Sequence, residues 1–125
     1  MSNLKSLNQE RASFALEKVK NIDSEEKNKY ATTAKKIPAM ITTNGLIPTL
    51  AFLKSKKESE SVYNTINEWL NQKGYNKNSQ NNDALESLLS CDFSTLRLAT
   101  MEAMAFANWL KRMVEIEMKE ENTDE

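Results

Sequence analysis

Three basic residues in the last third of the chain are spaced so that they can share one face of a helix. At about 100° per residue, Arg97, Lys111 and Arg112 point within about 60° of one direction. At a rise of about 1.5 Å per residue they form a strip about 20 Å long. Phosphate groups along a nucleic-acid backbone bind such a strip without selecting a base sequence. The spacing therefore favours electrostatic binding of nucleic acid.

The same face carries residues that suit contact with a protein. Met101 and Met104 offer adaptable apolar contacts, Asn108 lies between them and the basic pair, and Trp109 lies at the edge between this face and the core. We treat these four residues as candidate subunit contacts. A simpler interpretation is that the charged side chains only keep a surface helix soluble.

Residue types that support catalysis are scarce. The chain has no histidine, and its two glycines, Gly45 and Gly74, cannot build a glycine-rich phosphate loop. One cysteine, Cys91, excludes an internal disulfide and gives no zinc-ligand spacing. Acidic pairs such as Glu25–Glu26 fall where helix ends or solvation account for them. We expect no catalytic residue, no metal, no cofactor and no small-molecule substrate; a metal-dependent nuclease is the remote alternative.

Helix-forming residues and apolar spacings of three and four predict an all-α fold, a compact single-domain bundle of about six helices. The first helix is expected over about 8–22. A second is expected to be capped by Asp23 and broken at Pro38, which restarts a short helix through Ile41. Gly45 then suits the left-handed conformation that ends a helix, and Pro48 suits the first turn of the next, to about residue 57.

The second half of the chain predicts one short and two longer helices. One carries Trp69 and Leu70 and ends near Gly74, and residues 75–82 form an exposed loop rich in Asn and Ser. A short helix around residues 85–89 precedes the last, which Asp92 or Ser94 caps and which runs to about residue 118. Trp69 and Trp109 are expected to pack rather than stack on bases.

Length and charge divide the chain into a body and an end. Its 125 residues fit one helical domain over 1–113, and 114–125 form the end of the last helix and an acidic tail. Six acidic residues and one lysine give that tail a charge of −5, so the remainder carries −1 + 5 = +4. No run of residues is apolar enough to cross a membrane, and no signal peptide is evident, so we expect a cytoplasmic protein without a membrane partner.

Residues 36–56 contain both prolines and a distinctive run of motifs. Asn44-Gly45-Leu46 is followed by Leu50-Ala51-Phe52-Leu53-Lys54-Ser55-Lys56. Arg11-Ala12 with Ala15 and Val19 precedes these motifs, and Trp69-Leu70 and Trp109-Leu110-Lys111-Arg112 follow them in order. This pattern resembles the small helical subunit of the type III-B CRISPR effector (Cmr) complex from about residue 9 to about 113. Two positions depart from it: Leu96 stands where Tyr is usual, and Met101 where a basic residue is common.

The resemblance implies a non-catalytic structural subunit that acts in antiviral defence. Such subunits stack with copies of themselves along the backbone subunits and contact phosphates of guide RNA and target RNA. The RNA-contact candidates are then Lys111, Arg112 and Arg97, with Lys54 and Lys56 added because they belong to the Lys-Ser-Lys match. The competing hypothesis is a helical protein–protein interaction adaptor or homodimer without nucleic-acid contact. Salt dependence separates the two, because phosphate contacts weaken steeply with ionic strength.

Overall fold

The computed structural model describes the backbone of residues 5–123 and the side chains of residues 5–119, and the helices there contain most of the residues. Six α-helices and one short 3₁₀ turn follow one another along this part of the chain, without a strand: α1 Leu7–Lys20, α2 Lys27–Asn44, α3 Leu46–Ser55, η1 Lys57–Ser59, α4 Glu60–Gln72, α5 Ala84–Leu89 and α6 Phe93–Thr123. The predicted all-α class and the single bundle of about six helices are confirmed.

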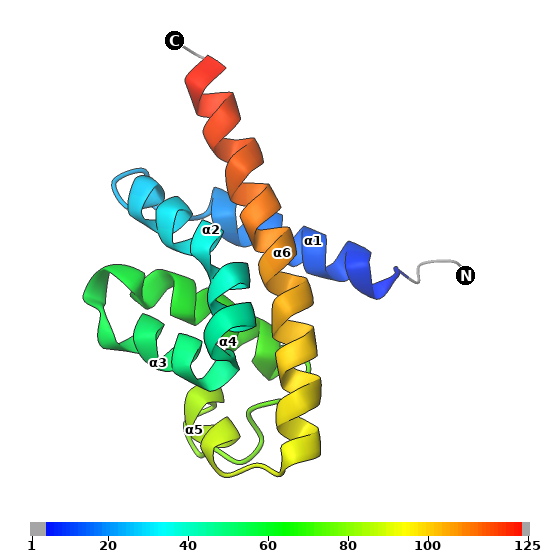
Figure 1. Cartoon of the computed structure of the whole chain (residues 1–125). Coiled ribbons are helices and arrows are strands. Elements are labelled where there is room, and N and C mark those ends of the chain that lie inside the picture. The colour runs from blue at the N-terminus through cyan, green and yellow to red at the C-terminus, as the bar shows by residue number, and fades with distance from the viewer. Residues whose placement is uncertain (1–4, 124–125) are drawn as a thin grey trace.

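The long helix α6 organises the bundle. It starts beside α5, runs the length of the molecule, and its C-terminal end extends past the other helices (Figure 1). Helices α1 and α2 make most of the contacts with α6, and α4 adds further ones, whereas α3 packs on α2, α4 and α5. One side of α6 is therefore covered by other helices, and its opposite side is left free.

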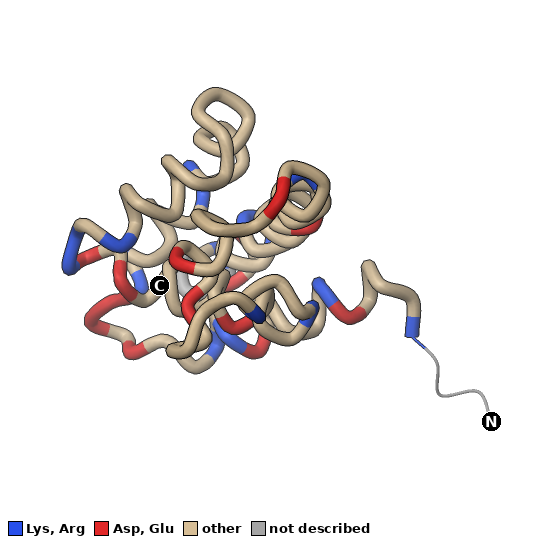
Figure 2. The backbone as a smooth tube through the Cα atoms, turned by 90° about the horizontal axis from the view of Figure 1, so that it is seen from below, with Lys and Arg blue, Asp and Glu red and all other residues tan. Residues whose placement is uncertain are grey.

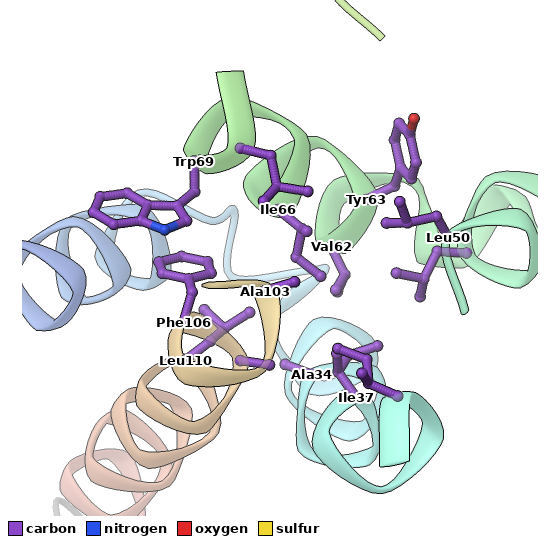
Figure 3. Close-up of a cluster of buried hydrophobic side chains, with 14 of the residues drawn as sticks. Ala34, Ile37, Leu50, Val62, Tyr63, Ile66, Trp69, Ala103, Phe106 and Leu110 are labelled. Atoms are coloured by element: carbon purple, nitrogen blue, oxygen red, sulfur yellow. The ribbon is translucent and has the colours of Figure 1, made fainter. Parts of the chain in front are cut away.

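An aromatic cluster joins α1, α4 and α6 at the centre of the core. The rings of Trp69 and Phe106 stack with centroids 5.1 Å apart, and Phe14 lies 5.3 Å from Trp69 and 5.9 Å from Phe106. Figure 3 shows the Trp69–Phe106 stack and the aliphatic side chains of α2, α3 and α4 that continue the core. Trp69 is only 1% exposed, so packing, as predicted, and not base stacking accounts for it.

The predicted break at Pro38 is wrong, because α2 continues through this residue to Asn44. Proline lacks the N–H that would donate to the carbonyl of Ala34, and a proline in a helix interior costs roughly 3 kcal/mol. Ala34, Ile37 and Ile41 lie on both sides of Pro38 and are all buried on one face. Packing of that face on the core is what keeps the two halves of α2 in one helix.

Replacing Pro38 with alanine should therefore stabilise the protein. Alanine restores the missing donor, and this gain outweighs the greater freedom that alanine gives the unfolded chain, so we expect the free energy of unfolding to rise by about 1–2 kcal/mol in urea titrations. Pro48 is the matched control. It lies in the first turn of α3, where an N–H group would have no carbonyl within the helix as its hydrogen-bond partner. Pro48→Ala should lower stability by less than about 1 kcal/mol. Equal effects at both positions would contradict this account.

The ends of the helices agree with the sequence in part. Gly45 has a φ of 90° and joins α2 to α3, and Pro48 lies in the first turn of α3, both as predicted. Asp23, by contrast, does not cap α2. The helix begins after Glu26 without a side-chain cap, and the carbonyl of Asp23 instead accepts a hydrogen bond from the N–H of Glu26 in the preceding turn.

The segment between α4 and α5 has no helix, but its polar side chains are not all exposed. Asn76 and Ser79 are buried. The amide of Asn76 donates to the carbonyl of Asn82 at 3.0 Å, and the hydroxyl of Ser79 accepts from the backbone N–H groups of Asn81 and Asp83. The lack of apolar residues in this segment had predicted that it is exposed to solvent. Here the two buried polar side chains form hydrogen bonds with backbone groups of the turn, and these bonds hold the segment in place without apolar packing.

Helix α6 ends later than residue 118, the predicted end. It runs without interruption past position 113 to Thr123, and Val114 within it is buried. Glu115 and Glu117 are half-buried. The side chains of Glu120 and Glu121, and all of Asp124 and Glu125, lie outside the described residues, so the acidic tail stays a prediction. Over the described part of the chain, no helix combines the length and the apolar character needed to cross a membrane.

Candidate functional site

The free face of α6 carries most of the residues that the sequence singled out. Six residues of α6 are buried against the other helices: Ala99, Ala103, Phe106, Ala107, Leu110 and Val114. On the opposite side Arg97, Met101, Asn108, Lys111 and Arg112 are exposed, which matches the face predicted from 100° spacing. We call this side of the helix, from Phe93 to Lys119, the free face of α6.

The candidate subunit contacts differ in how far they reach solvent. Met104 was expected to be exposed, but it is half-buried and packs against the core. Trp109 lies at the edge of the free face as expected; its indole Nε1 donates to Asn8 Oδ1 at 3.3 Å, which ties it to the start of α1. Met101 remains available at 58% exposure. The apolar part of the free face is thus displaced toward the N-terminal end of α6.

Lys111 and Arg112 border a shallow hollow on the free face. The hollow has a volume of 260 Å³ and is lined by these two residues together with Asn108 and Glu115. Among the described side chains, neither cation forms an ion pair or a hydrogen bond, so both are available to an external anion. Glu115 lowers the formal charge of the hollow to +2 − 1 = +1. Such a site suits one phosphate held by two cations and an amide better than it suits a long polyanion.

Charge elsewhere on the molecule does not extend this basic area. Figure 2 shows Lys and Arg interspersed with Asp and Glu along the backbone rather than gathered in one region. A wider hollow of 670 Å³, between the start of α2, η1 and the start of α4, contains four glutamates and two lysines. Its formal charge of −2 disfavours phosphate. The basic residues of α6 therefore do not belong to a wider basic surface. Along the helix axis, Arg97 lies about 21 Å from Lys111.

A polar network beneath α6 was missed by the sequence analysis. Glu102 accepts two hydrogen bonds from the Arg11 guanidinium, both at 2.7 Å, and one from Trp69 Nε1 at 2.9 Å. Arg11 also donates to Asn8 Oδ1 at 2.8 Å, so the same asparagine holds both Arg11 and Trp109. The signal was present, because Glu102 is the one acidic residue between positions 93 and 114.

The network also sets the charge state of its members. Burial by itself would raise the pKa of Glu102, but the hydrogen bonds from Arg11 and Trp69 outweigh it and hold that pKa below its ordinary value. The hydrogen bond to Glu102 raises the pKa of Arg11. Glu102 is therefore an ionised carboxylate at neutral pH that fastens α1 and α4 to α6. It positions the free face through three charge-assisted or indole hydrogen bonds.

The described residues show no metal site: nowhere among them do three Cys, Asp or Glu side chains come together closely enough to hold an ion. The model of the family described as CRISPR-associated protein (Cas_Cmr5) matches residues 7–117. The chain belongs to the Cmr5 family.

Two relatives agree with this assignment. The CRISPR system Cmr subunit Cmr5 of Thermotoga maritima is 28% identical over 116 residues, which cover 90% of this chain and 85% of that protein. The crystal structure of a CRISPR-associated Cmr5 family protein from Thermus thermophilus superposes with a TM-score of 0.75 at 26% identity, covering 90% of this chain and 97% of that one. The resemblance inferred from the motifs is thereby confirmed.

Several residues of the motifs that indicated the Cmr5 family have structural roles in the core and in the connections between helices. Gly45 makes the α2–α3 connection, and Leu50 and Leu53 of the following motif are fully buried. The other residues of that motif reach solvent, among them its two lysines at the end of α3, which packs on α2, α4 and α5. The Lys-Ser-Lys match therefore does not extend the basic strip of α6.

Lys54 is engaged within the protein. Its ammonium lies 2.9 Å from an oxygen of Asp83 and 5.5 Å from the ring centre of Tyr63, whose hydroxyl donates to the same carboxylate. Burial, strengthened by Asp83, raises the pKa of Tyr63, so the phenol stays protonated and donates. Lys56 is exposed and lies 5.0 Å from the ring centre of Phe52. Of the two, Lys56 is the one that remains free to meet an external anion.

One further surface was not anticipated. Four apolar side chains, at the end of α5 and in the first turns of α6, are largely exposed: Leu89 at 66%, Phe93 at 78%, Leu98 at 54% and Met101 at 58%. We call these residues the apolar corner. The sequence predicts Leu89 in a short helix and Met101 on the free face, but it does not predict that all four side chains are exposed.

Proposed function

We propose that the chain is a non-catalytic structural subunit of a Cmr-type CRISPR effector complex in antiviral defence, and that the free face of α6 contacts guide or target RNA. Its partners are the backbone subunits, further copies of itself and the two RNA strands. Membership of the Cmr5 family supports assembly into a Cmr complex. The observation that carries the RNA contact is the exposure of Lys111 and Arg112 beside the Asn108 amide, in a hollow of 260 Å³.

The contact we propose is electrostatic and does not read sequence. Trp69 is buried in the core and Trp109 is half-buried and bonded to Asn8, so neither presents a free ring for base stacking. Two cations and one amide can hold a phosphate oxygen, but they offer no pattern that distinguishes bases. Selection of the target then belongs to base pairing with the guide, and the subunit contributes affinity and position.

Charge reversal tests this assignment. In a reconstituted effector complex, Lys111→Glu with Arg112→Glu should weaken retention of RNA and make the slope of log affinity against log salt shallower by about 1.4 to 1.8, the value expected for two lost phosphate contacts. The matched control is Lys35→Glu with Lys36→Glu, two exposed lysines on α2 that give the same change of charge. If the α6 variant retains RNA at low salt as well as the wild type does, the free face of α6 does not contact RNA.

The second candidate function is a helical adaptor or homodimer that never meets nucleic acid. The apolar corner is the observation that favours it, because exposed apolar side chains can be buried against a protein partner. Its binding would persist as salt rises, whereas phosphate contacts weaken steeply. A salt titration of the native assembly therefore separates the two candidates.

A further inference from the structure

The junction of α2 and α3 contains the one asparagine–glycine pair of the chain, Asn44 and Gly45. Asn44 is the last residue of α2 and is exposed, and its side-chain amide forms no hydrogen bond with the described residues. Glycine has no Cβ to shield its backbone nitrogen, so this nitrogen can reach the side chain that precedes it. The pair therefore places a side-chain amide next to the least hindered backbone nucleophile that a peptide chain offers.

The reaction open to this pair is loss of the side-chain amide. The Gly45 nitrogen, after its proton passes to hydroxide, forms a bond to Cγ of Asn44. The bond from Cγ to Nδ2 breaks, and the leaving NH₂ takes a proton from water and departs as ammonia. Water then opens the five-membered imide at one of its two carbonyls, which gives aspartate, or isoaspartate with the main chain running through Cγ. Water is the co-reactant, and no atom is oxidised or reduced.

The fold opposes this reaction at two points. The N–H of Gly45 donates to the carbonyl of Ile41 at 2.9 Å, and a hydrogen-bonded N–H resists deprotonation. Closing the ring also brings Cβ and Cγ of Asn44 into one plane with the Gly45 nitrogen, which requires ψ of Asn44 to leave the helical range. Ile41 and Leu46, on either side of the pair, are buried and hold the last turn of α2 in place.

We propose that Asn44 is a site of spontaneous deamidation, and that the last turn of α2 protects it, so that the reaction proceeds when this turn opens. The rate in the folded protein is then the rate in the unfolded chain multiplied by the fraction of time for which the turn is open. This inference does not rest on the RNA contact. It goes beyond the role of the pair as a connection between helices, because it makes the same two residues the place where the chain ages.

The products of the reaction do not fit the junction. Aspartate adds a negative charge at the C-terminal end of α2, where the helix dipole disfavours it. Isoaspartate adds one carbon atom to the main chain, which displaces the N–H that now reaches Ile41 and the entry into α3, whose first residue, Leu46, is buried. Modification should therefore accumulate in chains that have unfolded, and it should hinder their refolding.

Comparison of folded with unfolded protein tests the protection. The tryptic peptide 37–54 contains Asn44 and no other asparagine, so mass spectrometry assigns the exchange of NH₂ for OH to this residue. At mildly alkaline pH, deamidation should be about tenfold or more slower in buffer than in guanidinium chloride, and hydrogen exchange of the Gly45 amide should be slowed to a similar extent. Equal rates in the two solutions, or an unmodified peptide after incubation in the denaturant, would overturn the proposal.

A second asparagine–glycine pair provides the matched control. Asn82 has a φ of 54°, which glycine adopts without strain, and neither its N–H nor its side chain forms a hydrogen bond with the described residues. Asn82→Gly creates such a pair at positions 81–82, between α4 and α5 and outside any helix. In the folded variant, Asn81 should deamidate about tenfold or more faster than Asn44, whereas the two rates should be similar in guanidinium chloride. If Asn81 reacts no faster than Asn44 in the folded variant, α2 does not protect Asn44.

Discussion

Replacement of Trp69 by alanine is expected to lower the free energy of unfolding by about 3–5 kcal/mol, a large share of what a domain of this size possesses. Trp69 is 1% exposed and stacks on Phe106 at 5.1 Å between ring centroids, and the ring of Phe14 lies tilted against it at 5.3 Å. Alanine removes the ring from the point where α1, α4 and α6 meet, and the surrounding side chains cannot all close the space. Urea titration followed by circular dichroism measures the loss.

Two conservative variants separate the ring from its N–H group. Trp69→Phe keeps an aromatic ring but removes the donor to Glu102, so it should cost about 1–3 kcal/mol. Trp109→Phe removes an indole donor that reaches Asn8 at 3.3 Å near solvent, and should cost less than about 1 kcal/mol. If Trp69→Ala cost no more than Trp109→Phe, the aromatic cluster would not be the centre of the core.

The structure shows which features could be predicted from sequence. The burial of Trp69 is predictable because apolar residues recur at three and four along α4, and that period is a property of the helix alone. Exposure of Arg97, Lys111 and Arg112 followed from the same geometry. Local sequence rules are thus enough to predict the helices and to say which side of each helix is buried.

The remaining features depend on contacts between distant residues. Pro38 obeys a local rule that predicts a break, but the core on both sides of it holds α2 together. Asn76 and Ser79 looked solvated because nothing in the sequence shows that their side chains satisfy a turn. Arg11 and Glu102 are 91 positions apart, so no spacing rule connects them. Lys54 and Lys56 differ in availability for a similar reason, because the distant residue Asp83 forms an ion pair with Lys54 and not with Lys56.

The Arg11–Glu102 pair carries the second large effect, which depends on pH. Because the folded-state pKa of Glu102 lies below its ordinary value of 4.5, ionised Glu102 contributes stability that is fully present above that value. The contribution is lost as the pH falls through the folded-state pKa. Glu102→Gln keeps the shape of the side chain but not the charge, and should cost about 2–3 kcal/mol at pH 7 because Arg11 loses its ionic partner.

The pH profile distinguishes this charge from a purely steric role. The difference in stability between wild type and Glu102→Gln should shrink toward acid pH and be constant from about pH 6 to 8, measured by urea titration at each pH. Glu68→Gln is the control: Glu68 pairs with Lys18 at 2.9 Å on the surface, and such pairs contribute about 0–1 kcal/mol. A pH-independent difference would mean that Glu102 acts by packing alone. Because Glu102 is the residue that fastens α1 and α4 beneath the free face, its loss should also disturb that face, whereas Glu68→Gln should leave it intact.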